Sequence, residues 1–343
     1  MNDLTLASTH AISLMVQEIT GSLSGYPNPT ISRGTPTVSA WENYDALHYP
    51  KEHPAKSPRY THWIDETTLW RTQMTSALPN LLRRTSADTT WLCPGMVWRR
   101  DVIDRTHVGT PHQMDIWMIR KGKTAMDELT QMIERVVEGI LPGVRWRANK
   151  TSHYYTVDGL EVEVEVNGHW MEILECGLAH PEILDEAGLS GWSGLAMGLG
   201  LDRAVMLRKG LPDIRLLRSE HPQIARQMEN LSPWLPVSLQ PSMKRDISIV
   251  VAADVQEEDL VETIQKLLGA DASLIQEMTI LSRTAHAGLP VQARERLGCA
   301  EGQDNLLVRI VLQSLGRTLT NDEANQIQKR LLIGLHQGSV SLL

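Results

Sequence analysis

The spacing of apolar residues predicts two amphipathic helices in the first half of the chain. Across Thr9–Leu23, apolar residues recur every three or four positions, and the pattern ends near Gly25 and Pro27. The same spacing recurs across Ala125–Leu141. A repeat near 3.6 residues gathers apolar side chains on one helix face. We therefore expect both helices to pack against a core through that face.

A strictly alternating run in the middle of the chain predicts a half-exposed strand. Leu160–Val166 alternates glutamate with apolar residues, so the valines share one face. Asn167-Gly168 is typical of a tight hairpin turn, and Trp170–Leu174 is the predicted return strand. A hairpin beside amphipathic helices favours an α+β fold with an antiparallel sheet flanked by helices, rather than alternating βαβ units.

A Pro- and Ser-rich stretch at 232–240 predicts a linker between two domains, at 1–231 and 241–343. In the second domain, Thr320-x-x-Glu323 is a capping box that predicts the start of a helix. The order of the predicted elements is typical of a ferredoxin-like domain. These elements are a strand at Asp246–Val251, a helix at Glu257–Leu268, a strand at Asn305–Gln313, a helix at Thr320–Gly334 and a short strand at Ser339–Leu343.

Composition narrows the class of protein. The chain has 343 residues, of which 42% are hydrophobic and 22% charged. These values suit two globular domains and exclude a fibrous or mainly disordered chain. The formal net charge of -8 argues against a general binder of polyanions. No stretch is long and apolar enough for a membrane helix, so we expect no membrane partner.

Two further features favour a cytoplasmic location. The three cysteines, Cys93, Cys176 and Cys299, are scattered without the spacing of metal ligands, which fits reduced thiols. No lysine or arginine precedes Arg33, unlike the start of a secretory signal or an organellar transit peptide.

Three segments carry charged residues that a fold alone does not require. Trp98–His107 contains three arginines and two aspartates, and Trp170–Pro181 contains two glutamates. Gly194–Leu207 joins a predicted Gly-rich turn to a helix whose first turn carries Arg203. Each segment alone has an ordinary structural explanation, because ion pairs are common on strand surfaces and Gly-x-Gly is common in turns.

Together these residue types suit a nucleoside triphosphate. On a strand, Arg99 and Asp101 would share one face. Guanidinium groups spread positive charge over phosphates, and a carboxylate binds Mg²⁺. Convergence of two arginines and a carboxylate on one pocket would therefore bind a triphosphate with its metal ion.

In this order and spacing, the segments resemble class II aminoacyl-tRNA synthetases, and within them the phenylalanyl-tRNA synthetase family. Arg99–Gln113 resembles motif 2 of the class, and Gly198–Arg203 resembles motif 3. Asn43–Ala55 resembles the segment that precedes the active site. Lys244–Val250 and Gly316–Glu323 resemble a ferredoxin-fold anticodon-binding domain. The resemblance covers nearly the whole chain and fits the single-chain organellar type.

The resemblance implies that the chain uses ATP and Mg²⁺ to form an aminoacyl-adenylate and then transfers the amino acid to tRNA, with tRNA-Phe as the expected partner. Arg99 would contact the α-phosphate and Arg203 the γ-phosphate, and Glu172 would hold Mg²⁺. Gln113 and Asp115 would bind the substrate α-amino group. Such catalysis rests on positioning and charge stabilisation. A monomer or a homodimer fits the resemblance.

The resemblance assigns the candidate site residues by position. The implied catalytic residues are Arg99, Asp101, His107 and Arg203. The implied amino-acid-binding residues are Thr75, Ser76, Gln113, Asp115, His153, Tyr155, Leu195, Ala196 and Met197. The implied ATP-binding residues are Arg99, Glu172, Gly198, Gly200 and Arg203, with Glu172 also the metal ligand. The implied tRNA-binding residues are Arg245, Arg317, Lys329 and Arg330.

The chain departs from the family at the amino-acid pocket. His153-Tyr154-Tyr155 stands where the family has Phe-Pro-Phe, and Leu195-Ala196-Met197 stands where it has Phe-Ala-Phe. Glu175 replaces a glycine, and Gln73 replaces a histidine. The retained alanine keeps depth for an aromatic ring.

Two counts bear on function. The sequence contains no phenylalanine, although it has 10 Trp and 6 Tyr. Residues 241–343 carry 10 Lys and Arg against 13 Asp and Glu, so RNA binding there needs a local basic face.

Three explanations remain open for the missing phenylalanine and the altered pocket. The chain is a backup enzyme for phenylalanine, made when charged tRNA-Phe is scarce. Alternatively, its pocket is altered for a different amino acid or a carrier acceptor. A non-catalytic regulatory paralogue is the third explanation, which the retained Arg99, Gln113, Asp115 and Arg203 disfavour.

Overall fold

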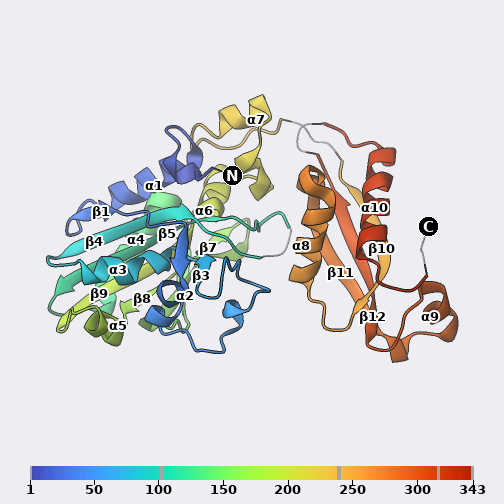
Figure 1. Cartoon of the computed structure of the whole chain (residues 1–343). Helices are drawn as coiled ribbons and strands as arrows, with labels where there is room; N and C mark the ends of the chain where they lie inside the picture. The colour runs from blue at the N-terminus through green and yellow to red at the C-terminus, as the bar shows by residue number, and fades with distance from the viewer. Residues whose placement is uncertain (1, 101–103, 238–240, 315–316, 341–343) are drawn as a thin grey trace. The chain divides into compact units, whose positions relative to one another are not determined.

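The computed structural model describes residues 2–100, 104–237, 241–314 and 317–340 (Figure 1). By its contacts the chain divides into two compact units. The first comprises residues 1–99, 110–218 and 224–235, and the second comprises 100–109, 219–223 and 236–343. Among the helices described, none is long and apolar enough to cross a membrane.

A seven-stranded sheet forms the centre of the first unit, in the order β1-β4-β5-β9-β8-β7-β6. All neighbouring strands are antiparallel except β1 and β4, which are parallel. This confirms the predicted α+β class with an antiparallel sheet, with one parallel pair added at its edge. The strands are β1 (Pro29–Ile31), β4 (Thr89–Met96), β5 (His112–Lys121), β6 (Trp146–Lys150), β7 (Thr156–Val166), β8 (His169–Ala179) and β9 (Trp192–Gly200).

The predicted hairpin is confirmed as β7 and β8. Asn167 and Gly168 join the two strands with φ values of 52° and 79°. Two consecutive residues with positive φ match the twist of the flanking strands, which is why Asn-Gly favours this turn.

Helices cover both faces of this sheet. On one side, α1 (Ala11–Ser22), α4 (Met126–Ile140) and α6 (Leu201–Lys209) pack against one another, and α4 contacts β8. The first two are the predicted amphipathic helices, and their apolar stripes are buried. On the other side, α3 (Leu78–Arg83) and α5 (Pro181–Glu186) join a core cluster that contains Trp117 and Tyr155.

Shorter elements complete the first unit. Strands β2 (Thr37–Ser39) and β3 (Thr68–Trp70) form a separate two-stranded sheet. The remaining helical segments are η1 (Leu4–Leu6), α2 (Ala40–Asn43), η2 (Asp45–Leu47), η3 (Pro54–Lys56), η4 (Met74–Ala77), η5 (Ile214–Arg218) and α7 (Pro222–Gln227).

The second unit has a three-stranded antiparallel sheet in the order β10-β12-β11. Helices α8 and α10 bury their apolar faces in one core with these strands, as a ferredoxin-like domain requires. The capping box at Thr320 and Glu323 is present at the start of α10. The elements are β10 (Met243–Ala252), α8 (Glu257–Leu268), η6 (Gly269–Leu274), β11 (Ile275–Ala285), η7 (His286–Gly288), α9 (Val291–Leu297), β12 (Gln303–Leu312) and α10 (Asn321–Leu335).

The predicted terminal strand differs from the structure. Ser339 and Val340 form a bend rather than a strand, and 341–343 lie outside the described residues. The chain bonds to the edge of β10 slightly earlier, where the Gln337 N–H donates to the Val250 carbonyl over 2.8 Å. The bend follows because the Ser339 N–H is bonded to the Gly298 carbonyl instead.

Candidate active site

Two carboxylates converge over a glycine in the middle of the large sheet. Asp115 on β5, Gly198 on β9 and Glu175 on β8 are direct cross-strand partners. Directly paired residues in an antiparallel sheet project to the same face. A Cβ atom added to Gly198 would lie 3.6 Å from Asp115 Oδ1 and 3.8 Å from Glu175 Oε1. The glycine therefore leaves open space between the two carboxylates.

Asp115 is buried and incompletely bonded. Its Oδ2 has no hydrogen-bond partner among the described residues. Burial raises the pKa of Asp115 to about 7, and the charge of Glu175 adds to this, while a Thr75 hydrogen bond opposes it. An ammonium group that entered the site would donate a hydrogen bond to this free oxygen and pair with the carboxylate charge.

Glu175 is held by two aromatic side chains. The Tyr155 hydroxyl donates to Glu175 Oε1 over 2.6 Å, and His153 Nε2 lies 3.2 Å from Oε2. Burial opposes ionisation of Glu175, but these bonds outweigh it and lower its pKa. The rings of His153 and Tyr155 stack with centroids 5.7 Å apart, and Trp117 lies 6.1 Å from Tyr155. An aromatic wall thus lines the same face as the carboxylates.

The register separates the predicted pocket residues into two groups. Ala196 pairs with Trp117 and so faces the site. Leu195 and Met197 alternate with Ala196, so they project to the opposite face of the sheet. Both are fully buried there. The prediction that Leu195 and Met197 line the amino-acid pocket is therefore wrong, and the assignment of Ala196 to that pocket stays a prediction.

A β-bulge brings Glu172 to the same face as Glu175. Leu174 pairs with Val162, and Glu172 with the very next residue of β7, so Ile173 is the extra residue in β8. In a regular strand two residues three positions apart face opposite sides. The bulge adds one residue and turns Glu172 back toward the site.

Arg203 lies beside Glu172. Its Nη1 donates to the Glu172 backbone carbonyl over 3.2 Å and lies 4.0 Å from the carboxylate. Burial raises the pKa of Glu172, which Arg203 only partly offsets. The negative charges of Glu161 and Glu175 also raise the pKa of Glu172. The Glu172 carboxylate is a hard oxygen donor that fits Mg²⁺, and the neighbouring guanidinium fits phosphate.

The Gly-rich segment before Arg203 is a strand, which corrects the predicted turn. Gly194–Gly200 lies within β9, and α6 begins at Leu201 with Gly200 as its N-cap residue. Because β9 leads directly into α6 without a loop, Gly198 near the end of the strand and Arg203 in the first turn of the helix both lie beside the site.

Arg99 approaches the site from irregular backbone. Strand β4 ends at Met96, so Arg99 is not on the predicted strand, and Asp101 lies outside the described residues. The ladder with β5 stops because Pro111 has no N–H to donate. Arg99 Nε donates to the Thr72 carbonyl over 2.7 Å, and its charge lowers the pKa values of Asp115 and Glu175.

Asn43 is a supporting residue, which the sequence analysis placed in the segment before the active site without giving it a role. Its side chain exchanges hydrogen bonds with Thr72, and its backbone carbonyl accepts from Gln73. Thr75 and Ser76, two and three positions after Gln73, are buried, and the Ser76 hydroxyl donates to the Gln73 carbonyl. The Ser76 side chain therefore stabilises the turn that begins at Gln73, whereas the Thr75 side chain is hydrogen-bonded to Asp115.

Gln113 and His107 occupy different settings. Gln113 lies on β5 two residues before Asp115, paired with Gly200, and so shares the face of the site. His107 belongs by its contacts to the second unit. Its Nδ1 lies 2.7 Å from Asp104 Oδ2. The structure thus describes His107 with its loop neighbours, and a catalytic role for it stays a prediction.

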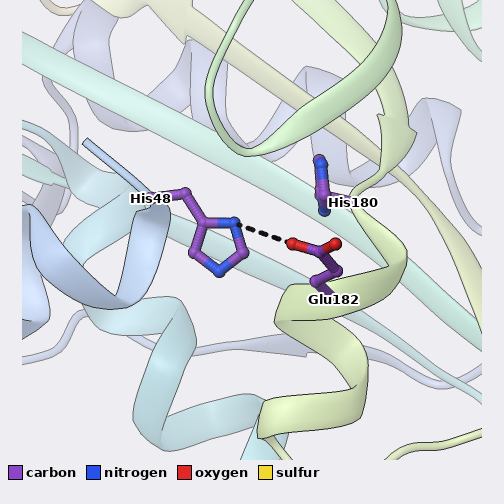
Figure 2. Close-up of side chains that lie close together, drawn as sticks. All are labelled: His48, His180 and Glu182. Atoms are coloured by element: carbon purple, nitrogen blue, oxygen red, sulfur yellow. Dashed lines mark ion pairs between the residues drawn. The ribbon is translucent and has the colours of Figure 1, made fainter. Parts of the chain in front are cut away.

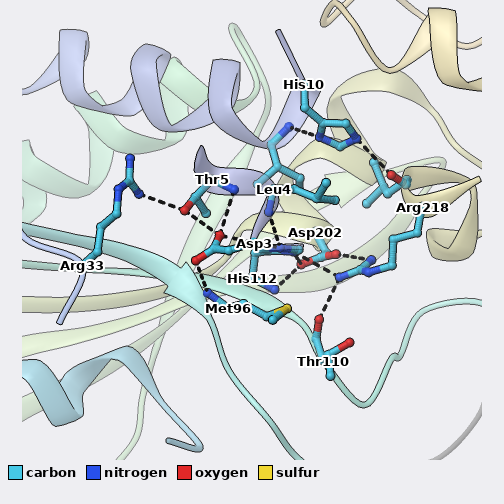
Figure 3. Close-up of polar contacts among 12 residues, drawn as sticks. Asp3, Leu4, Thr5, His10, Arg33, Met96, Thr110, His112, Asp202 and Arg218 are labelled. Atoms are coloured by element: carbon cyan, nitrogen blue, oxygen red, sulfur yellow. Dashed lines mark hydrogen bonds and ion pairs between the residues drawn. The ribbon is translucent and has the colours of Figure 1, made fainter. Parts of the chain in front are cut away.

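A buried ion-pair network connects the start of β5, in the segment that resembles motif 2, with the start of α6, in the segment that resembles motif 3 (Figure 3). Asp202, in the first turn of α6, accepts from the His112 backbone N–H and is paired with Arg218 over 2.6 Å. Burial would raise the pKa of Asp202, but Arg218 and His112 lower it to about 2. His112 Nε2 accepts from the Leu4 N–H over 3.1 Å. His112 is therefore structural, and the network fixes the start of β5 against that of α6.

Three of the four predicted tRNA-binding residues lie around α10. Arg245 on β10 donates to the side chains of Asn321 and Asn325, and Lys329 is exposed one turn further along the same helix face. Arg317 pairs with Glu323 over 2.6 Å at the start of α10.

Arg330 has a structural setting instead. Its guanidinium pairs with Asp271 over 2.5 Å and donates to the carbonyls of Leu267 and Leu268 at the end of α8. A cation bonded to the last carbonyls of a helix stabilises that end.

Comparisons with known protein families agree with this architecture. Residues 1–228 match the tRNA synthetases class II core domain (F), and residues 238–339 match the ferredoxin-fold anticodon binding domain. The chain belongs to the class II tRNA synthetases, and it is an aminoacyl-tRNA ligase of that class. The family resemblance predicted from the sequence is thus confirmed.

Several curated relatives of this chain are named phenylalanine–tRNA ligases. The mitochondrial phenylalanine–tRNA ligase of Saccharomyces cerevisiae is 26% identical over 95% of this chain and 86% of its own length. The chloroplastic/mitochondrial phenylalanine–tRNA ligase of Arabidopsis thaliana is 27% identical over 87% of this chain and 68% of its own. The phenylalanine–tRNA ligase alpha subunit of Haemophilus ducreyi is 31% identical over 61% of this chain and 64% of its own length.

A solved structure shares the fold. The pyrrolysyl-tRNA synthetase of Desulfitobacterium hafniense superposes with a TM-score of 0.50 and 17% identity, over 63% of this chain and 76% of that one.

Proposed function

We propose that this synthetase activates phenylalanine or a close aromatic analogue with ATP and then transfers it to tRNA. The observation that carries the proposal is the buried Asp115 carboxylate, whose Oδ2 is unpartnered and which lies on the same face as an aromatic wall. An α-ammonium group there would complete the hydrogen bonding of Asp115. The names of the relatives support the same substrate.

The residues divide the work of adenylate formation. Asp115 and Gln113 would hold the α-amino group, so that the substrate carboxylate faces Arg99. A carboxylate oxygen then attacks the α-phosphorus of ATP, and pyrophosphate leaves. Arg99 would stabilise the charge on the α-phosphate, and Arg203 would hold the γ-phosphate. Mg²⁺, for which Glu172 is the proposed ligand, would neutralise charge on the phosphate oxygens when bound.

The side chain of the substrate would lie between Ala196 and the rings of His153 and Tyr155. Contacts between aromatic rings contribute about 0.5–1.5 kcal/mol beyond area burial, which favours an aromatic substrate. Glu175 adds a hydrogen-bond acceptor that phenylalanine does not need. Ring-hydroxylated analogues of phenylalanine therefore belong in the substrate panel.

The test is amino-acid-dependent ATP–pyrophosphate exchange, measured with the full chain and without tRNA. Exchange with phenylalanine or its ring-substituted analogues supports the proposal. Exchange with an unrelated amino acid alone means that the altered pocket selects a different substrate. Absence of exchange with every amino acid would favour a non-catalytic role.

The acceptor is tested separately. We propose tRNA-Phe, bound in part by residues 241–343 through the basic side chains Arg245, Arg317 and Lys329. The expected result is charging of tRNA-Phe by the full chain, with loss of charging and not of exchange when these three cations are replaced. Exchange without charging of any tRNA would instead indicate a carrier acceptor.

The absence of phenylalanine supports a role as a backup enzyme. A chain without this residue can be translated when charged tRNA-Phe is scarce. Replacement of several core Met or Leu codons by Phe codons should then lower synthesis of the protein under phenylalanine limitation. Unchanged synthesis would overturn this part of the proposal. The cytoplasmic location of this chain stays a prediction, since its relatives include mitochondrial and chloroplastic forms.

A further inference from the structure

A second cluster of polar side chains lies outside the proposed active site. His48 follows η2, His180 joins β8 to α5, and Glu182 lies on α5 (Figure 2). Figure 2 shows the three side chains turned toward a common point. One ligand atom of each lies within 4.8 Å of the others.

We propose that His48, His180 and Glu182 bind a zinc-type divalent transition metal ion. Two imidazoles and one carboxylate are the donor types that zinc selects, at bond lengths of about 2.0–2.2 Å. Ligand atoms around such an ion lie roughly 3.3–3.5 Å apart in a tetrahedral geometry. The present separation between His48 Nδ1 and Glu182 Oε2 is 3.9 Å. Small rotations of the side chains are enough to close the site.

His180 has an unused nitrogen. Its Nδ1 is buried and has no hydrogen-bond partner among the described residues. Buried polar atoms are nearly always bonded, so an unpartnered nitrogen on an imidazole ring that lies beside two other donor side chains points to a missing ligand. The His180 ring also contacts the His48 ring edge to face, with centroids 5.2 Å apart.

His48 has the second bond that metal-bound histidines usually make. Its Nε2 lies 3.2 Å from Glu186 Oε1, while its Nδ1 faces Glu182. A histidine that donates one N–H to a carboxylate presents the other nitrogen unprotonated for a metal ion. Glu186 is therefore a positioning residue that sets the tautomer of His48.

The metal ion would tie two segments that border the amino-acid site. The His180 backbone N–H donates to the Tyr155 carbonyl over 3.1 Å. On the other side, Tyr49 follows His48 directly and its hydroxyl donates to Gln73 Oε1 over 3.2 Å. Binding would stabilise these contacts, because an ion bound only by the folded state raises its stability.

The test is zinc titration of the metal-stripped full chain in competition with a chromogenic chelator. We expect one tight equivalent per chain. Because the Glu182 side chain is 75% exposed, Glu182→Gln should fold normally and yet weaken zinc at least tenfold. His48→Asn should weaken zinc as much, and Glu186→Gln about 10–100-fold as an outer partner. His169→Asn, which removes an exposed histidine elsewhere on β8, and Asp185→Asn on α5 are the matched controls and should keep wild-type affinity.

A second measurement uses stability. Zinc should raise the unfolding temperature of the wild-type chain and of His169→Asn, but not of His48→Asn. The proposal is overturned if the wild-type chain takes up no stoichiometric zinc, or if His48→Asn and Glu182→Gln bind it as tightly as the controls. Equal competition by Mg²⁺ would also overturn it, since a site with two imidazoles prefers the softer ion.

Discussion

Glu172 and Glu175 face the same side of the large sheet, although they are three positions apart on one strand. The bulge at Ile173 causes this, because it inserts one residue between the pairs with β7. As a result one carboxylate lies beside Arg203 and the other beside Asp115. The proposed phosphate side and amino-acid side of the reaction are thus built from a single strand.

This arrangement predicts separate roles for the two glutamates. Glu172→Gln should lower kcat/KM for ATP by about 10–100-fold, because a charge-assisted interaction is worth about 1.5–3 kcal/mol. It should also raise the Mg²⁺ concentration needed for half-maximal exchange. Glu161→Gln removes a neighbouring carboxylate that does not contact Arg203 and serves as the control. An equal effect of both variants would show that only the total negative charge matters.

Local patterns predicted much of the fold, and distant contacts explain what they missed. The hairpin of β7 and β8 followed from alternation and Asn167-Gly168, which act within a few residues. By contrast, His112 and Asp202 are 90 residues apart, so no sequence pattern joins them. The bulge at Ile173 also leaves no local signal, because its cause is the pairing with another strand.

In the candidate site too, sequence motifs predicted some residues correctly, and the pairing of distant strands explains the residues that they misplaced. The motifs predicted Asp115 and Glu172, which lie on one face of the sheet, and Arg203 of α6, which lies beside Glu172. The family resemblance assigned Leu195 and Met197 to the pocket because they stand at the two Phe positions of the family's Phe-Ala-Phe. The period of two residues along a strand sends them to the opposite face.

The raised pKa of Asp115 predicts a pH-dependent step. Because an ammonium group binds the ionised carboxylate, kcat/KM for the amino acid should rise with pH and level off above about 7, the pKa of Asp115 in the free enzyme. Asp115→Asn should lower kcat/KM by roughly 10–100-fold and remove this rise. Exchange kinetics between pH 5.5 and about 8.5 check it. An unchanged pH profile in the variant would assign the titration to another group.

The same carboxyl group should make the folded state less stable at high pH. Its pKa is about 7 when folded and 3.8 as the ordinary value. Between these values the folded chain binds more protons than the unfolded chain, so the Asp115 contribution to stability falls as pH rises. Asp115→Asn should therefore raise the free energy of unfolding at pH 8 more than at pH 5. Urea denaturation at both pH values measures this, and an equal effect at both would contradict it.

Asp202 should have the opposite pH dependence and a large stability effect. Its pKa is lowered to about 2, so its contribution is present above about pH 4 and is lost as the pH falls toward 2. Asp202→Asn removes the buried counter-ion of the largely buried Arg218 side chain, which costs about 3–5 kcal/mol of the free energy of unfolding. Asp246→Asn breaks an exposed pair with Arg309 and should cost less than about 1 kcal/mol. Similar losses for the two variants would contradict the network as a stabilising element.

Lys329 and Arg330 are adjacent but should respond differently to substitution. Lys329 is exposed on the α10 face that carries the partners of Arg245, so Lys329→Glu should raise KM for tRNA several-fold and leave ATP–pyrophosphate exchange unchanged. Arg330 is bonded to Asp271 and to the end of α8. Arg330→Gln should therefore lower the unfolding temperature with little change in KM for tRNA. Aminoacylation at two salt concentrations separates the cases, because a lost phosphate contact reduces the salt dependence of binding. If Lys329→Glu charges tRNA with the wild-type KM, this face of α10 does not contact the RNA.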